Sequence, residues 1–454
     1  MYINQGIQQS INDQIGLGIG GFLKAGPRPS QEPSGQDSVP RETYTPGTRG
    51  SSPGLIPPPT HSDSPGSDSK PVLPQGTPSP LLFPIDPTLF PNRVSEELPR
   101  TENGALYILD NFNIKPLTSP AHGEMVEGSA LQSGFQGPVI KTQDPLSLGP
   151  LAHADILAME QENFSPKEAL EKIDNATRDY TTSILEKDTN YLSHLNGNEV
   201  RNSVVNLSSG TTPARITGFQ YQRVSRGWDN QATPRDEQLL QNYASAFGVD
   251  QEALASTDPK IHGPARQQLQ QKMANHFHEL LQEDPTIGEA VDNWDQTVET
   301  FEANKNSVVI AAGNEGLGVE KLTSKNHDLP INVPEGFSTN ILENELVTSV
   351  GATETRPVGG RMRVTRADYS SNSNGVDIYA DGRAPGSNKS TGTSFSAPRV
   401  AAVMSDLHRQ NPDLSSQDVE NLMKQALTYP IETVGGEIDI LDPEMAGRMM
   451  NNHN

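Results

Sequence analysis

Short and nearly continuous apolar runs recur along the chain from about residue 102 onward. Each run is too short for an ordinary helix and lacks the polar residue at every second position that a half-exposed strand shows. Runs of this kind are typical of strands that are buried on both faces of a parallel sheet. The runs that we assign to strands are residues 105–109, 204–207, 308–312, 346–350 and 376–380.

Segments in which apolar residues recur at helical spacing lie between these runs. One of them opens with Ser415 and has Asp418 three residues later, a pair that is typical of a capping box at a helix start. The alternation of strand and helix over about 350 residues predicts an α/β fold of three layers, α/β/α, with a mostly parallel central sheet. The predicted helices are residues 166–185, 287–303 and 415–427.

Residues 211–286 interrupt this alternation. The stretch is polar, contains helical segments such as residues 267–282, and carries no catalytic pattern. We expect a helical region here, within a domain that spans residues 101–450, and the family resemblance given below implies that it is an insertion between two core strands.

The first hundred residues have a different composition. Residues 26–100 hold 18 of the 37 prolines, mixed with Ser, Gly and Asp. Such a mixture has too little apolar surface to offset the entropy of ordering, so we expect residues 1–100 to be a disordered region. The start of the chain shows neither the early positive charge nor the compact apolar core of a Sec-type signal. A cytoplasmic location and export by another route therefore both stay open.

Charge and composition narrow the range of partners. The chain has 454 residues, a formal net charge of -23 and no cysteine. The acidic balance disfavours nucleic acid and anionic membranes as partners, and the lack of cysteine excludes disulfides, thiolate nucleophiles and cysteine-ligated zinc. No run reaches the about 18 apolar residues that a membrane span needs. We expect a monomer with no nucleic-acid partner and no membrane span.

The run from Gly392 to Ala401, G-T-S-F-S-A-P-R-V-A, carries the most specific chemical signal. Pro398 and the apolar residues after it predict a helix with the proline in its first turn, where its missing N–H is not needed. Ser394 then lies at the helix N-terminus, where free N–H groups and the helix dipole favour developing negative charge on an oxygen. The run resembles the nucleophile motif of subtilisin-like serine proteases, the subtilases of peptidase family S8.

The resemblance extends to a histidine and an aspartate. His122 opens the run H-G-E-M-V-E-G, which resembles the histidine motif of the family, H-G-T-H-V-A-G. Asp110 ends a predicted strand 12 positions earlier and is followed by Asn-Phe, where the family usually has Thr-Gly or Ser-Gly. The resemblance implies that Asp110, His122 and Ser394 form a catalytic triad, in which the aspartate orients the histidine and the histidine takes the serine proton. We expect Gly123 to leave room for the imidazole.

Two further segments resemble the family. Residues 308–316, V-V-I-A-A-G-N-E-G, resemble its oxyanion motif, which implies that the Asn314 amide and the Ser394 backbone N–H stabilise the tetrahedral oxyanion. Residues 202–210, N-S-V-V-N-L-S-S-G, resemble the strand beside the substrate cleft, whose edge could bind a peptide as an added strand. The substrate-binding residues that the resemblance implies are Ser208, Ser209, Gly210 and Gly313.

The resemblance as a whole implies a serine endopeptidase of the subtilisin-like fold that hydrolyses protein or peptide substrates. This chemistry requires no cofactor, and no metal-ligating residue is predicted, although structural calcium is common in the family.

Two alternatives stay open. The altered neighbours of Asp110 and His122 motivate a catalytically inactive binding or effector protein of the same fold. An esterase or lipase of the α/β-hydrolase type is disfavoured, because that fold orders its triad Ser, Asp, His and uses G-x-S-x-G.

Overall fold

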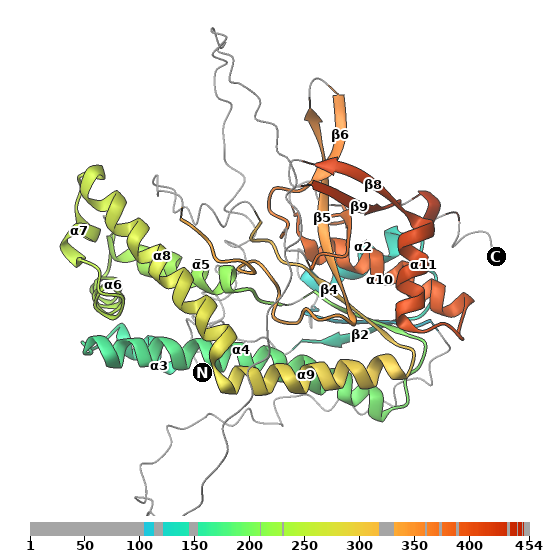
Figure 1. Ribbon diagram of the computed structural model, residues 1–454, viewed down its shortest axis with the longest axis horizontal. Coiled ribbons are helices and arrows are strands. Elements are labelled where there is room, and N and C mark those ends of the chain that lie inside the picture. The colour runs from blue at the N-terminus through green and yellow to red at the C-terminus, as the bar shows by residue number, and fades with distance from the viewer. Residues whose placement is uncertain are drawn as a thin grey trace, which may run out of the picture. The chain divides into compact units, whose positions relative to one another are not determined.

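The computed structural model describes the chain from Gly104 onward, with several gaps (Figure 1). The predicted disordered region, residues 1–100, lies outside the described residues. The described ranges are residues 104–112, 121–144, 153–208, 210–228, 231–316, 331–358, 361–371, 375–386, 390–433, 436–442, 444–446 and 448.

A single sheet of nine strands lies at the centre of the described residues. The strands follow the order β2-β1-β3-β4-β5-β7-β9-β8, and β6 pairs with β5 off this path. All neighbours from β2 to β9 along this path are parallel, whereas β6 and β8 run antiparallel to their partners. The strands are β1 (Leu106–Asp110), β2 (Val139–Gln143), β3 (Val204–Leu207), β4 (Ser307–Ala311), β5 (Val347–Val358), β6 (Arg361–Arg366), β7 (Ile378–Asp381), β8 (Thr428–Thr433) and β9 (Gly436–Leu441).

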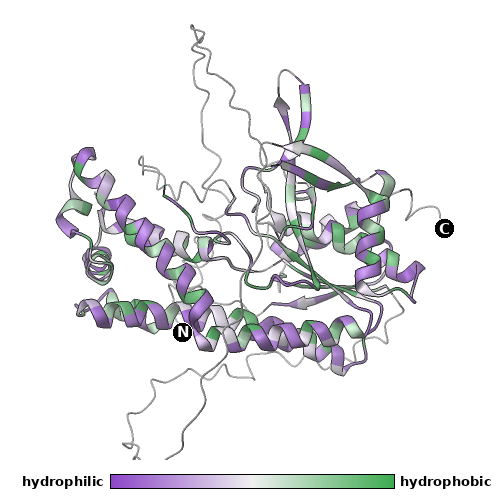
Figure 2. Ribbon diagram, viewed as in Figure 1, coloured by the Kyte–Doolittle hydropathy of each residue, from purple (hydrophilic) through white to green (hydrophobic). Residues whose placement is uncertain are grey.

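The five predicted apolar runs correspond to β1, β3, β4, β5 and β7, so the prediction of a mostly parallel α/β sheet is confirmed. Alternate side chains of β1 enter two different hydrophobic clusters. Leu106 and Ile108 belong to the cluster on one face of the sheet, and Tyr107 and Leu109 to the cluster on the other. The run is continuously apolar because both of its faces are covered. Figure 2 shows these strands as predominantly apolar.

Helices cover both faces of the sheet and complete the three layers. One face carries α2 (His122–Gln132), α10 (Thr393–Gln410) and α11 (Ser416–Leu427). The other face carries α4 (Pro166–Gly197) and α9 (Pro285–Ala303). Among the described helices, none is both long and apolar enough to cross a bilayer.

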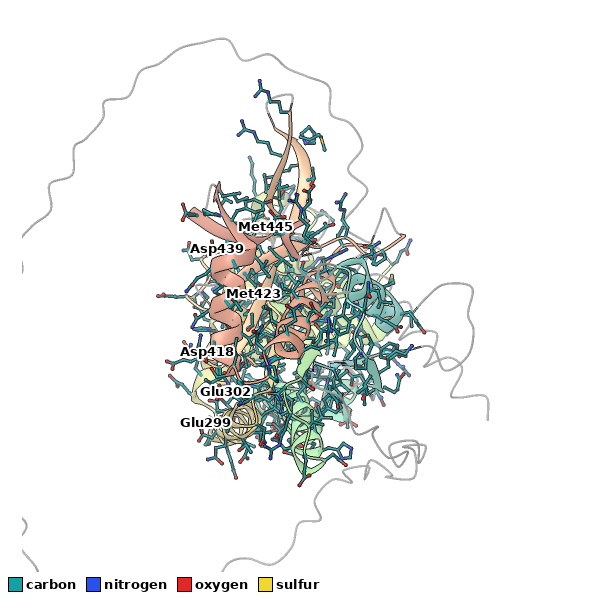
Figure 3. The ribbon with its side chains drawn as sticks, turned by 90° about the vertical axis from the view of Figure 1, so that its right-hand side faces the viewer. Glu299, Glu302, Asp418, Met423, Asp439 and Met445 are labelled. Atoms are coloured by element: carbon teal, nitrogen blue, oxygen red, sulfur yellow. The ribbon has the colours of Figure 1, made fainter. Side chains whose placement is uncertain are left out.

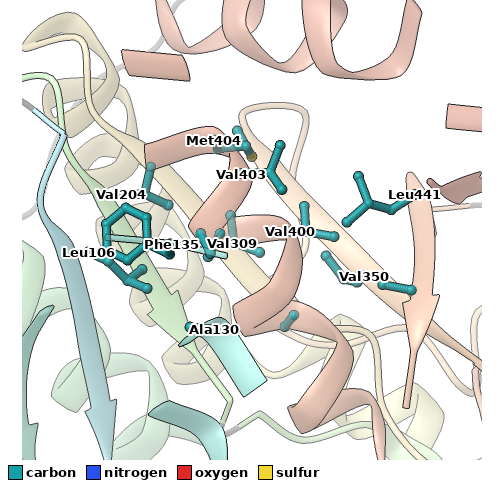
Figure 4. Packing of buried hydrophobic residues seen from close by; sticks show 14 of the residues in the cluster. Leu106, Ala130, Phe135, Val204, Val309, Val350, Val400, Val403, Met404 and Leu441 are labelled. Atoms are coloured by element: carbon teal, nitrogen blue, oxygen red, sulfur yellow. The ribbon is translucent and has the colours of Figure 1, made fainter. Parts of the chain in front are cut away.

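Helix α10 is buried along nearly its whole length. Figure 4 shows Val400, Val403 and Met404 of this helix among side chains of the neighbouring strands, including Val309 and Val350. A helix that is covered on most sides is held firmly in place by packing. Its N-terminus, which carries the predicted nucleophile motif, is therefore fixed relative to the sheet.

Helix α11 confirms the predicted capping box. The Ser415 hydroxyl accepts a hydrogen bond from the Asp418 N–H at 3.1 Å, and the Asp418 carboxylate accepts one from the Ser415 N–H at 3.3 Å. Asp418 is exposed at the helix start, whereas Met423 is buried against the sheet side (Figure 3).

A helical region with its own hydrophobic cluster adjoins the sheet. It joins the first part of α4 to α3 (Ala154–Met159), α5 (Pro213–Val224), the 3₁₀ turn η2 (Ser225–Trp228), α6 (Pro234–Ala246), α7 (Gln251–Ala255) and α8 (Pro259–Glu283). Helices α5 to α8 occupy the stretch that the sequence predicts to be helical, residues 211–286. That this stretch is an insertion within one domain of residues 101–450 stays a prediction.

Candidate active site

Three side chains from two distant parts of the chain meet at the carboxyl ends of the central strands. Asp110 is the last residue of β1, His122 is the first residue of α2, and Ser394 is the second residue of α10. Ligand sites of open α/β sheets form at this edge, because several strands end there side by side.

The His122 imidazole bridges the other two side chains. Its Nδ1 lies 2.8 Å and 3.0 Å from the two carboxylate oxygens of Asp110, and its Nε2 lies 3.0 Å from the Ser394 hydroxyl oxygen. A carboxylate can only accept, so Nδ1 carries the proton and the Nε2 lone pair faces the serine hydroxyl. The Asp110 side chain is 6% exposed and that of His122 is 26% exposed. The carboxylate is thus shielded from water while the imidazole stays accessible.

The loop after β1 holds the Asp110 carboxylate in place. The Asn111 N–H donates to it at 2.6 Å, and the side chain of Gln143, at the end of β2, accepts from the Phe112 N–H at 3.0 Å. A Cβ on Gly123 would lie 2.8 Å from the Phe112 ring and 2.9 Å from the Asn111 carbonyl oxygen. The expectation that this glycine makes room for the imidazole stays a prediction. The lack of a side chain at Gly123 leaves space for the loop that follows Asp110.

The Asn314 side chain is oriented by the start of α10. Its Oδ1 accepts hydrogen bonds from the Thr393 N–H at 2.8 Å and from the Thr393 hydroxyl at 3.2 Å. Because the backbone N–H is a donor, the atom that faces it must be the amide oxygen. The amide nitrogen of Asn314 consequently points away from Thr393, and among the described residues no acceptor takes its donors.

A second donor lies beside that amide. At the start of α10 the Thr393 N–H is bonded to Asn314, and the Phe395 N–H is bonded to the Gly392 carbonyl at 3.1 Å. The Ser394 N–H has no acceptor among the described residues. An unpaired N–H in the first helical turn favours an anion, and here it belongs to the same residue as the hydroxyl next to His122.

A comparison with known protein families found a match to this chain. A model of the subtilase family, peptidase S8, matches residues 109–435, which is more than half of the chain. The chain belongs to the subtilase family. The matched range includes Asp110, His122, Asn314 and Ser394, and membership supports a serine protease.

No curated protein matches this subtilase. Among solved structures, a lanthipeptide protease is 14% identical with a TM-score of 0.33 and covers 77% of this chain and 89% of its own. A protease named S41 psychrophilic protease is 16% identical with a TM-score of 0.30, and the match covers 72% of this chain and 84% of that protease. Sphericase is 14% identical with a TM-score of 0.30, and the match covers 72% of this chain and 84% of sphericase.

The position of Pro398 in this subtilase differs from the prediction. The sequence predicts the proline in the first helical turn, but α10 begins at Thr393 and Pro398 is its sixth residue. A proline there cannot donate to the carbonyl four residues earlier, which is that of Ser394. The Ser208 hydroxyl donates to the Ser394 carbonyl instead, at 3.2 Å, and accepts from the Asn206 amide at 2.8 Å. The helix can start earlier because the side chain of Ser208, the residue after β3, replaces the missing donor.

Three of the four predicted substrate-binding residues line a small pocket next to Asn314 and Thr393. They are Ser208, Gly210 and Gly313, whereas Ser209 lies outside the described residues. The other residues that line the pocket are Thr212, Arg215, Ala311, Glu315 and Asn340.

Gly313 in this pocket has a φ of +112°, and a Cβ there would lie 2.8 Å from the Ser371 hydroxyl oxygen. Both the backbone angle and the close approach require a glycine at this position.

Sequence reasoning missed the residues that support the predicted side chains. Thr393 orients Asn314, Gln143 holds the loop after Asp110, and Asn206 supports Ser208. A buried asparagine within the apolar run of β3 is the one signal that the sequence offers for such a role. Among the described residues, no group of three or more acidic, histidine or cysteine side chains is arranged to hold a metal ion.

Proposed function

We propose that this subtilase is a serine endopeptidase in which Asp110, His122 and Ser394 act as the catalytic triad. The observation that carries the proposal is the His122 imidazole, whose two nitrogens lie within 3.0 Å of a shielded carboxylate and of a hydroxyl. Serine chemistry requires a base within hydrogen-bonding reach of the nucleophile and a group that orients the base. The arrangement meets both requirements.

In the first half of the reaction, the Ser394 Oγ attacks the carbonyl carbon of the scissile peptide bond. The hydroxyl proton moves to Nε2 of His122, and the Asp110 carboxylate stabilises the imidazolium through the hydrogen bond from Nδ1. The carbonyl oxygen becomes an oxyanion, for which the Asn314 amide and the Ser394 N–H supply donors. Nε2 then gives its proton to the amide nitrogen, the carbon–nitrogen bond breaks, and the amine leaves.

In the second half, water replaces the amine. His122 takes a proton from the water as its oxygen attacks the acyl carbon, and the same donors hold the second oxyanion. The bond between the acyl carbon and Oγ breaks, and the proton returns from Nε2 to Ser394. The products are the two peptide fragments and the unchanged side chains.

Labelling with a fluorophosphonate tests the proposal, because the reagent modifies only an activated serine. We expect stoichiometric labelling of the wild-type chain and none of Ser394→Ala or His122→Ala. Ser183→Ala is the matched control, since this exposed serine of α4 lies outside the site and bonds only its own helix. A folded wild-type protein that takes up no label would overturn the enzyme and leave the inactive binding protein of the same fold.

A further inference from the structure

Strands β5 and β6 form a hairpin arm that extends past the part of β5 that pairs with β4 and β7. The pairing of the arm joins residues 353–358 of β5 to residues 361–366 of β6, whereas β4 and β7 pair only with residues up to 353. Figures 1 and 3 show the arm projecting beyond the other described strands.

The arm carries an unusual positive charge. Arg356, Arg361, Arg363 and Arg366 lie within eleven residues of a chain whose formal net charge is -23. Arg356 contacts Asp368 at 2.9 Å, so its charge is balanced.

Arg361 and Arg363 are exposed, and neither has a hydrogen bond or ion pair with any other described residue. The register also places Arg363 directly opposite Arg356. Because Asp368 already balances Arg356, the unbalanced positive charge of the arm is that of Arg361 and Arg363. The pair of free guanidinium groups thus favours an acidic ligand.

The two faces of β6 differ in chemistry. Side chains alternate along a strand, so Arg361 and Arg363 share one face while Met362 and Val364 share the other. Met362 is 65% exposed and Val364 is 38% exposed, both unusually high for apolar side chains. A ligand that follows the strand would therefore meet cations on one face and apolar groups on the other.

The outer edge of β6 is open to pairing. Among the described strands β6 pairs only with β5, and β8 lies near it without pairing. Such an edge presents alternate N–H and C=O groups to any extended chain that lies along it.

We propose that the β6 edge binds an extended, acidic segment of a protein partner as an added strand. Residues that face each other across strands share a face, so acidic residues at alternate positions of the partner would meet Arg361 and Arg363. Two residues of a strand span about 7 Å, which sets the carboxylate spacing. Each guanidinium can hold one carboxylate through two parallel hydrogen bonds. Apolar residues between the acidic ones would cover Met362 and Val364.

Other anionic partners fit the arm less well. Residues 353–366 include no aromatic side chain on which a base could stack. The net charge of -23 repels both nucleic acid and anionic lipid once either approaches the body. A single acidic peptide strand contacts only the arm and avoids that repulsion.

A binding measurement tests the proposal without relying on catalysis. The full-length chain with Ser394→Ala is titrated into a fluorescein-labelled peptide of alternating glutamate and valine, and anisotropy is recorded at low and high salt. We expect saturable binding that weakens at least tenfold when Arg361→Gln and Arg363→Gln are introduced together, and that weakens with salt. The matched control, Arg201→Gln with Arg235→Gln, removes two exposed arginines outside the arm and should bind as tightly as the parent.

Two altered peptides test the chemistry of the ligand. Glutamine in place of glutamate should abolish the binding, because it removes the carboxylates. N-methylation of alternate amides should abolish it too, because the peptide then cannot pair with the strand edge.

Several results would overturn the proposal. One is equal affinity for the glutamate and glutamine peptides. Another is an equal loss of peptide affinity in the arm variant and in the control variant. A third is arginine-dependent binding to vesicles of phosphatidylserine with no binding of the acidic peptide. A fourth is self-association of the arm variant when neither form binds the peptide, since the arginines then serve only to protect the strand edge.

Discussion

The Asn314 side chain shows how a single contact determines what a residue can do. An asparagine amide has one accepting end and one donating end, which differ only in orientation. The Thr393 N–H and hydroxyl both contact Oδ1, so the donating end is left free beside the Ser394 N–H. In the proposed mechanism Thr393 therefore orients an oxyanion donor, although its side chain takes no part in the proton transfer.

Substitution of Asn314 measures the value of that donor. We expect Asn314→Leu to lower kcat by about 10²–10³-fold with little change in KM, a magnitude that was itself measured on another subtilase. The reason is that the donor contacts the oxyanion more strongly than the ground-state carbonyl. Steady-state kinetics on a peptide substrate give both constants.

A second substitution removes the donating amide nitrogen of Asn314 but keeps the oxygen that accepts from Thr393. Asn314→Asp keeps an oxygen for the Thr393 N–H and lacks the donor, so its kcat should fall at least as far. A kcat near the wild-type value in either variant would contradict the role of Asn314.

At the scale of the element, α10 combines a buried body with an irregular first turn. Pro398 removes one hydrogen bond of the helix, and the Ser208 hydroxyl supplies another to the same carbonyl. Helix α10 is thereby bonded to Ser208, the residue after β3, at the residue that carries Oγ.

A double-mutant cycle tests whether the Ser208 hydroxyl replaces the N–H that Pro398 lacks. Ser208→Ala alone leaves the Ser394 carbonyl unpaired and should lower kcat by about tenfold, the equivalent of about 1.4 kcal/mol. In the background of Pro398→Ala, residue 398 regains an N–H that can bond this carbonyl, so Ser208→Ala should then cost much less. The same tenfold loss in both backgrounds would show that Ser208 acts in some other way.

The buried strands could be predicted from the sequence and the exposed ones could not. The runs that became β1, β3 and β4 are continuously apolar because helices cover both of their faces. β2 and β6 are partly or largely exposed, and their polar residues conceal the strand pattern. Helix α2 contains two glycines and only a weak apolar face, so its start at His122 becomes visible only in the structure.

The same distinction applies to the site. The motifs around His122, Asn314 and Ser394 are local in sequence, so their residue types and order could be read directly. Contacts such as Ser208 with the Ser394 carbonyl join residues 186 positions apart. No local pattern encodes such a contact, because it depends on the packing of β3 against α10.

At the scale of the whole molecule, His408 makes the stability of the folded chain depend on pH. Its side chain is fully buried near the end of α10, with Nε2 2.8 Å from the Ser307 hydroxyl oxygen. Burial lowers the pKa of His408 from 6.5 to about 4. Between these values the unfolded chain binds a proton that the folded chain excludes. The contribution of His408 to stability is thus full above pH 6.5 and is lost as the pH falls towards 4.

Two buried carboxyl groups have the opposite effect on how stability changes with pH. Burial raises the pKa of Asp188 to about 7, and burial together with the neighbouring Asp377 raises that of Glu343 to about 7. These groups are protonated more readily in the folded chain than in the unfolded one, so they favour the fold as the pH falls from 7 towards 4. The total pH dependence therefore does not report His408 alone.

The difference between wild type and His408→Gln isolates the histidine. Between pH 7 and pH 4 we expect the unfolding free energy of the wild type to fall relative to that of the variant by about 3 kcal/mol. Urea denaturation at several pH values gives both curves, and an overall loss of stability in the variant does not affect their difference in slope. Parallel curves would show that His408 does not titrate in this range.

The separation of the three site residues along the chain has a consequence during synthesis. Ser394 follows His122 by 272 residues. A ribosome that adds about 5–20 residues per second makes the histidine roughly 14 to 54 seconds before the serine. Under the proposed mechanism the emerging polypeptide has no nucleophile during that interval, so it cannot cleave the ribosome or the chaperones.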